Sequence, residues 1–112
     1  GADVLPFMVN RLPVSARSLV AGTALIGLSA DAFFEFSVSH WISTPAGGLP
    51  VAPEISPGRL GRVTCIYGAE EQDSLCRSIK SAGLRGVELP GGHHFDGDYA
   101  RVASAVLAGL PP

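Results

Sequence analysis

A nearly continuous apolar run from Leu19 to Leu28 is the feature that most constrains how this chain can fold. Such a run is typical of a strand in a parallel sheet, because helices cover both faces of that kind of sheet. The run is much shorter than the roughly 18 apolar residues that span a bilayer. We therefore expect it to be a strand of a parallel sheet built from right-handed βαβ crossovers.

Strand and helix patterns alternate along the rest of the chain. The predicted elements, in order, are a helix over residues 4–12, a strand over 19–28, a strand over 63–68, a helix over 74–83, a strand over 85–89 and a final helix over 99–110. Asp73 or Ser74 can cap the helix over 74–83, and Asp96 or Asp98 can cap the final helix. The pattern predicts an α/β fold, a parallel sheet of about three strands with flanking helices.

The stretch from Phe33 to Gly58 interrupts this alternation. Its second half is rich in glycine and proline, so we expect a loop excursion around residues 30–60 that is not a packed element. Its first half is aromatic, and two interpretations stay open for Phe34, Phe36 and Trp41. These side chains either line an acyl or lipid-facing substrate pocket or belong to the core.

The composition is that of a globular domain with a small core. The chain has 112 residues, 46% of them hydrophobic, and a formal net charge of −2. Its charged residues are scattered without a run, which leaves no basic surface for nucleic acid. The spacing of the two cysteines fits no zinc pattern. We therefore expect no nucleic-acid partner, no metal and no cofactor.

Two motifs at strand ends contain candidate catalytic residues. The strand over 63–68 runs into an acidic turn over residues 69–74, and the strand over 85–89 runs into a glycine turn that ends in His93 and His94. An acid followed by a histidine at strand ends is the chain order of the α/β-hydrolases. The acidic turn therefore favours a catalytic histidine over two loop histidines bound only to backbone.

Two residues compete for each of these roles. In related hydrolases the base directly follows a glycine-containing turn, so we assign His93 as the base and keep His94 as the alternative. Asp73 has a short side chain at a helix start, so we assign it as the acid, and Glu71 is the alternative. Ser29 follows a strand, but its surroundings lack the closing glycine of a nucleophile elbow, so we expect a strand-end or capping residue there.

The two cysteines flank the acidic turn. Cys65 lies on the predicted strand over 63–68, and Cys76 lies just past the turn. A pair this close can form a disulfide that closes a small loop, or both residues can be small buried apolar side chains in a reducing compartment. The residues alone leave both possibilities open.

Five separated motifs occur along nearly the whole chain. They span residues 1–7, 34–41, 50–54, 65–76 and 91–99. In this order they resemble the AcvB/VirJ family of bacterial virulence-associated α/β-hydrolase domains. In that family a G-x-S-x-G nucleophile elbow reads directly into a Gly-Ala-Asp segment, so Gly1 matches the last glycine of the elbow. The resemblance therefore implies that residues 1–112 are the C-terminal portion of a single α/β-hydrolase domain, with the serine two residues before Gly1.

The resemblance also implies a function and a location. It suggests a periplasmic serine-type ester hydrolase whose substrates are lipid-linked esters, including aminoacyl esters of phosphatidylglycerol. The alternative is a non-catalytic interaction module whose partners are components of a virulence or secretion system. A periplasmic setting favours the disulfide between Cys65 and Cys76, which would hold the acidic turn.

The same resemblance predicts what this stretch of chain needs for stability. A sheet of about three strands leaves an unpaired edge and exposed apolar surface. We therefore expect residues 1–112 to pack against the N-terminal half of the same domain or to form a homo-oligomer. Without the serine of the elbow, we expect these residues alone to hydrolyse no ester.

Overall fold

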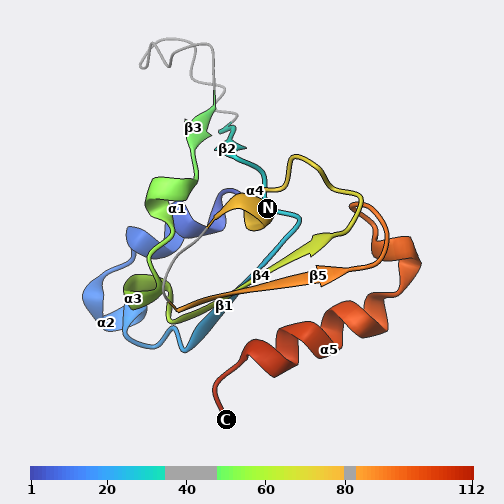
Figure 1. The fold of residues 1–112 in the computed structure, drawn as a ribbon. Coiled ribbons are helices and arrows are strands. Elements are labelled where there is room, and N and C mark those ends of the chain that lie inside the picture. Colours follow the sequence, from blue (N-terminus) through green and yellow to red (C-terminus); the bar gives the residue numbers. More distant parts are fainter. Residues whose placement is uncertain (35–47, 80–82) are drawn as a thin grey trace.

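A three-stranded parallel sheet forms the centre of the molecule (Figure 1). The structure is a computed structural model that describes residues 1–34, 48–79 and 83–112. The strands are β1 (Gly22–Ile26), β4 (Arg62–Gly68) and β5 (Leu84–Leu89), in the spatial order β1-β4-β5. Both neighbouring pairs are parallel, which confirms the predicted α/β fold.

The central strand β4 is buried on both of its faces. Successive side chains of a strand point to opposite faces, so β4 takes part in two separate cores. Val63 and Cys65 lie in the larger core together with Leu25 of β1. Ile66 lies in the smaller core. Burial on both faces explains why the sequence of this strand is apolar without strict alternation.

Helices cover the two faces of the sheet. One face is covered by α5 (Tyr99–Gly109), which contributes Val102 to the smaller core. The other face is covered by α1 (Leu5–Asn10), α3 (Pro57–Leu60) and α4 (Leu75–Ser78), and the short helix α2 (Val14–Arg17) precedes β1 (Figure 1). None of the described helices is long and apolar enough to cross a membrane.

The stretch around residues 30–60 differs from the expected loop excursion. A small antiparallel sheet joins β2 (Asp31–Ala32) to β3 (Leu49–Pro50), and a 3₁₀ helix, η1 (Ala52–Glu54), follows. Val51 and Leu60 are completely buried in the larger core. The expectation of an unpacked segment is therefore wrong for residues 51–60, because short helical turns accommodate the prolines while apolar residues between them reach the core.

Two predicted elements are shorter in the structure. The apolar run from Leu19 to Leu28 forms a strand only over Gly22–Ile26, and Leu19 is 83% exposed. The helix expected over 74–83 ends at Ser78, because the backbone at Ile79 is extended. The final helix matches its prediction, and of its two candidate caps Asp98 is the one whose side chain accepts a hydrogen bond from the backbone of Arg101.

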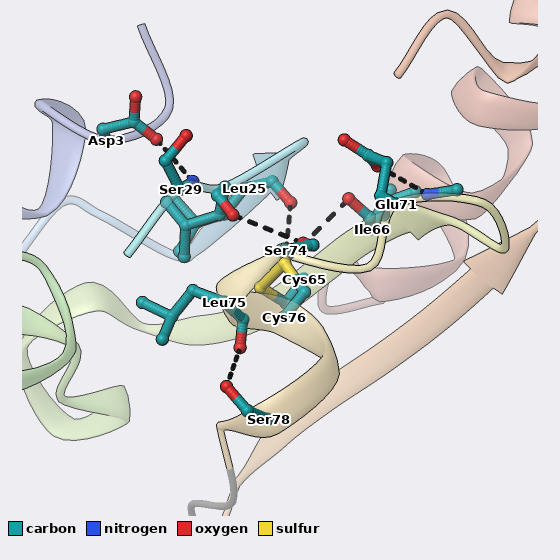
Figure 2. The surroundings of a disulfide bond; sticks show 12 residues. Asp3, Leu25, Ser29, Cys65, Ile66, Glu71, Ser74, Leu75, Cys76 and Ser78 are labelled. Atoms are coloured by element: carbon teal, nitrogen blue, oxygen red, sulfur yellow. Dashed lines mark hydrogen bonds between the residues drawn. A yellow bond between two sulfur atoms is a disulfide. The ribbon is translucent and has the colours of Figure 1, made fainter. Parts of the chain in front are cut away.

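Cys65 and Cys76 form a disulfide, as predicted. The bond joins the central strand β4 to the first turn of α4 (Figure 2). Both residues are buried, with exposed fractions of 0% and 4%. The disulfide therefore closes the connection that contains the acidic turn.

Candidate active site

The acidic turn and the histidine turn lie against each other at the carboxyl ends of β4 and β5. The backbone N–H of Ala69 donates to the carbonyl of Leu89 at 2.8 Å, and that of Glu70 donates to the carbonyl of Gly91 at 3.0 Å. A Cβ atom on Gly68 would collide with the Gly91 and Gly92 carbonyls, so this approach requires glycine. The two turns thus meet at the edge of the sheet where open α/β folds bind ligands.

His93 and Glu71 form a hydrogen-bonded pair at this edge. The Nδ1 atom of His93 lies 2.7 Å from Oε1 of Glu71. The second carboxylate oxygen of Glu71 accepts a hydrogen bond of 2.7 Å from the backbone N–H of Gly68. An ionised carboxylate can only accept hydrogen bonds, so Nδ1 donates, and in the neutral imidazole Nε2 is then the nitrogen with the lone pair of a base. A carboxylate that binds Nδ1 of a histidine is also how the base of a catalytic triad is oriented.

Burial distinguishes the two members of the pair. The side chain of Glu71 is 11% exposed and that of His93 is 65% exposed. The carboxylate is therefore enclosed by the turn that holds it, whereas the imidazole is accessible to a substrate.

The imidazole of His93 lies over Gly27, the residue that follows β1. Gly27 has a φ of +63°, and a Cβ atom there would lie 2.5 Å from Cε1 of His93. Only glycine adopts this conformation without strain and leaves room for the ring. Gly27 is thus part of the site, and its only signal in the sequence is a glycine at the end of an apolar strand.

The first residues of the chain lie at the same edge of the sheet. A carboxylate oxygen of Asp3 accepts a hydrogen bond of 2.8 Å from the backbone N–H of Ser29, which lies beyond the end of β1 (Figure 2). Gly1 is exposed, and its carbonyl accepts a hydrogen bond of 3.3 Å from the N–H of Val4. In the described part of the chain, the Ser29 hydroxyl makes no hydrogen bond with a histidine.

The structure pairs His93 with the alternative acid and not with Asp73. Asp73 is exposed, and within the described ranges it makes no hydrogen bond with a histidine. The backbone N–H of Glu71 donates to the Gly68 carbonyl at 3.0 Å, which folds the turn so that Glu71 reaches the histidine. Asp73 lies farther along, where Ser74 is already bonded to the Leu28 carbonyl.

The alternative base, His94, lies beside His93 in the same turn. Their ring centroids are 5.7 Å apart and the rings are nearly perpendicular. His94 is exposed, and among the described residues no carboxylate pairs with it. The geometry therefore favours His93 over His94 as the base.

One member of the predicted substrate pocket is described. Phe34 packs edge to face on Phe7, with ring centroids 5.3 Å apart. An apolar hollow of about 280 Å³ is lined by Phe7, Met8, Arg11, Phe34 and Leu49. Phe36 and Trp41 lie outside the described residues.

A separate polar cluster lies between α1 and η1. Arg11 binds both carboxylate oxygens of Glu54 at 3.2 Å, and the Asn10 amide donates to Oε2 at 2.7 Å. These hydrogen bonds, above all those from Arg11, hold the pKa of Glu54 below its ordinary value. Glu54 is thus paired within the protein.

Comparison with known proteins gives one result. A family model described as bacterial virulence protein (VirJ) matches residues 1–111, almost the whole chain. No curated protein and no solved structure gives a significant match. In the described residues, no three His, Cys, Asp or Glu side chains are grouped in a way that could hold a metal ion.

Proposed function

Because this chain belongs to the VirJ family of bacterial virulence proteins, we propose that it forms the acid–base part of a serine-type ester hydrolase. His93 is the general base, and Glu71 orients it. The observation that supports this best is the 2.7 Å hydrogen bond between Nδ1 of His93 and Oε1 of Glu71. Its position at the carboxyl edge of a parallel sheet is where α/β-hydrolases have these two residues.

The proposed reaction proceeds in two steps. A serine Oγ attacks the ester carbonyl carbon while its proton moves to Nε2 of His93, and the same proton then passes to the departing alcohol. A water molecule, deprotonated by His93, next attacks the acyl carbon, the bond to the serine Oγ breaks, and His93 returns the proton to Oγ as the acid is released. The Glu71 carboxylate keeps the imidazole in the required tautomer and stabilises the imidazolium that forms in both steps.

The nucleophile in this proposal is the serine of a G-x-S-x-G elbow whose last glycine is Gly1. The family resemblance suggests this position. The hydrogen bond between Asp3 and Ser29 supports it, because that bond holds the first residues of the chain at the edge of the sheet where His93 lies over Gly27. The chain is then the C-terminal portion of the α/β-hydrolase domain.

The proposed substrates are lipid-linked esters, including aminoacyl esters of phosphatidylglycerol, and the proposed location is the periplasm. The disulfide between Cys65 and Cys76 supports an oxidising compartment. Phe34, Phe36 and Trp41 line the substrate pocket in this proposal. The apolar hollow beside Phe34 supports that role for the first of them.

The test is a set of substitutions in the full-length protein, assayed with an activated ester and with vesicles that contain aminoacyl-phosphatidylglycerol. We expect His93→Ala to lower turnover by about 10⁴-fold, since it removes the base. Glu71→Gln should lower it by about 10²-fold or more, because the amide no longer stabilises the imidazolium.

The matched controls are His94→Ala and Asp73→Asn, which change neighbours of the same chemical type. Both should keep most of the activity, because neither side chain belongs to the hydrogen-bonded pair. Equal activity of the wild type and His93→Ala would overturn the proposal. That result would instead favour the non-catalytic interaction module of a virulence or secretion system.

A further inference from the structure

We propose that Arg77 is a positioning residue that holds the acidic turn so that Glu71 can bind His93. This inference rests on the proposed function of the pair. Arg77 lies in α4, directly after the disulfide-bonded Cys76. Nothing in the sequence pattern singles it out, because it is one of several scattered arginines.

The guanidinium of Arg77 binds the acidic turn at two points. Its Nε donates to the backbone carbonyl of Glu71 at 3.1 Å, and its Nη2 donates to the carbonyl of Ala69 at 2.7 Å. A guanidinium presents its donors in one rigid plane, so these two bonds set the distance and orientation between the two carbonyls. One side chain therefore fixes the backbone of the residue that supplies the acid.

Arg77 is itself held against the sheet. Its Cζ lies 5.1 Å from the centroid of the Tyr67 ring on β4. Its Nη1 lies 3.7 Å from a carboxylate oxygen of Glu88 on β5. The disulfide fixes the backbone of the preceding residue to β4. The guanidinium thus connects the acidic turn to two strands of the sheet.

The catalytic pair depends on this support because Glu71 is on a turn and not on a strand. The carboxylate oxygens are bound by Gly68 and His93, so any displacement of the Glu71 backbone changes both distances. A misplacement of about 1 Å can lower a catalysed rate by about 100-fold. Removing the two bonds from Arg77 should loosen the pair without removing any group that touches the substrate.

The experiment compares Arg77→Gln with the wild type in full-length protein labelled with ¹⁵N-histidine. The imidazole nitrogen shifts, recorded at alkaline pH where histidine is neutral, show which ring nitrogen has the proton. We expect one Nδ1–H tautomer of His93 in the wild type and a mixture of both tautomers in Arg77→Gln. We also expect ester turnover to fall by about 100-fold, with KM changed much less.

Three further variants separate positioning from charge and from stability. Glu88→Gln removes only the ion pair, and Arg85→Gln removes an exposed arginine of β5 that makes no hydrogen bond or ion pair within the described residues. Both should keep the wild-type tautomer, because the ion pair with Glu88 is partly exposed and weak, whereas the two carbonyl bonds of Arg77 and its contact with Tyr67 remain. Arg77→Lys keeps the charge but lacks the planar pair of donors, so it should resemble Arg77→Gln. It also serves as the test variant if Arg77→Gln does not fold.

The outcomes distinguish this inference from the proposed function. A folded Arg77→Gln or Arg77→Lys protein with His93 still in a single Nδ1–H tautomer would overturn the positioning role, whatever the activity. A change of tautomer in a protein whose His93→Ala variant is fully active would retain the positioning role and reject the hydrolase. A loss of folding cooperativity with an unchanged tautomer would show that Arg77 contributes stability alone.

Discussion

At the scale of single residues, close packing of glycine backbones brings the candidate catalytic pair together. Gly68 lets the histidine turn approach the acidic turn, and Gly27 lets the His93 ring lie over the end of β1. Glu71 then uses both of its carboxylate oxygens, one for Gly68 and one for His93. The geometry of the site therefore depends on the room that these glycines leave as much as on its polar groups.

Gly27→Ala tests this packing. The substitution places a Cβ against the His93 ring and strains a residue with positive φ, so we expect a loss of about 1–2 kcal/mol in unfolding free energy. Turnover of the activated ester should fall by about 100-fold, because the ring must move. Gly86→Ala on β5 is the matched control, since no atom of the described residues lies within 4 Å of its Cβ position. Wild-type turnover in Gly27→Ala would contradict the placement of His93.

At the scale of elements, the segment between the two sheets is part of the larger core. Val51 precedes η1, Leu60 ends α3, and both are fully buried beside β4. The connection from β4 to α4 is also anchored, because the disulfide lies at its ends and the N–H of Leu75 donates to the Leu28 carbonyl at 2.8 Å. Short elements thus owe their stability to tertiary contacts and not to their own length.

Leu60→Ala measures how much the packing of the 51–60 segment contributes to the free energy of unfolding. Truncation of a fully buried leucine should lower the unfolding free energy by about 2–5 kcal/mol, because it leaves a cavity. Leu107→Ala on α5 is the control. That side chain is 67% exposed, so its truncation should change the unfolding free energy by no more than about 0.5 kcal/mol. Urea unfolding followed by circular dichroism provides both values. Equal midpoints for the two variants would mean that the segment is not packed as described.

At the scale of the whole molecule, the sheet ends in two edge strands. Within the described residues, β1 and β5 each pair only with β4. Several large apolar side chains are also exposed, among them Val14, Leu19 and Phe33 at 71%, 83% and 71%. We propose that this surface packs against the N-terminal half of the same domain or against a second copy of the chain.

Expression of residues 1–112 alone tests that proposal. We expect the chain to self-associate, because unpaired strand edges and apolar surface favour contact with further chains. Light scattering should then give a mass above the 11.5 kDa of one chain. Co-expression with the preceding portion of the domain should suppress the association. A monomer of 11.5 kDa that unfolds cooperatively would show that the chain covers its own sheet.

The sequence alone was enough to predict the α/β fold and the final helix, and the family resemblance, which implies an oxidising compartment, added the disulfide. Apolar periodicity reports local geometry, so the order of strands and helices is readable without tertiary information. The cap of the final helix is equally local, since Asp98 bonds to the backbone of Arg101. The candidate base His93 could also be proposed, because it directly follows a glycine turn at a strand end.

Only the tertiary structure decided which acid binds His93 and which part of the proline- and glycine-rich stretch is buried. Glu71 and Asp73 lie on one turn, and the choice between them depends on how hydrogen bonds with Gly68 and Gly91 fold that turn. The burial of residues 51–60 depends on the elements that pack against them in the larger core. The supporting role proposed for Arg77 depends on two backbone carbonyls that the folded turn brings within hydrogen-bonding distance of its guanidinium. Local patterns determine elements, whereas contacts between turns and across the core are set by the packing of the whole chain.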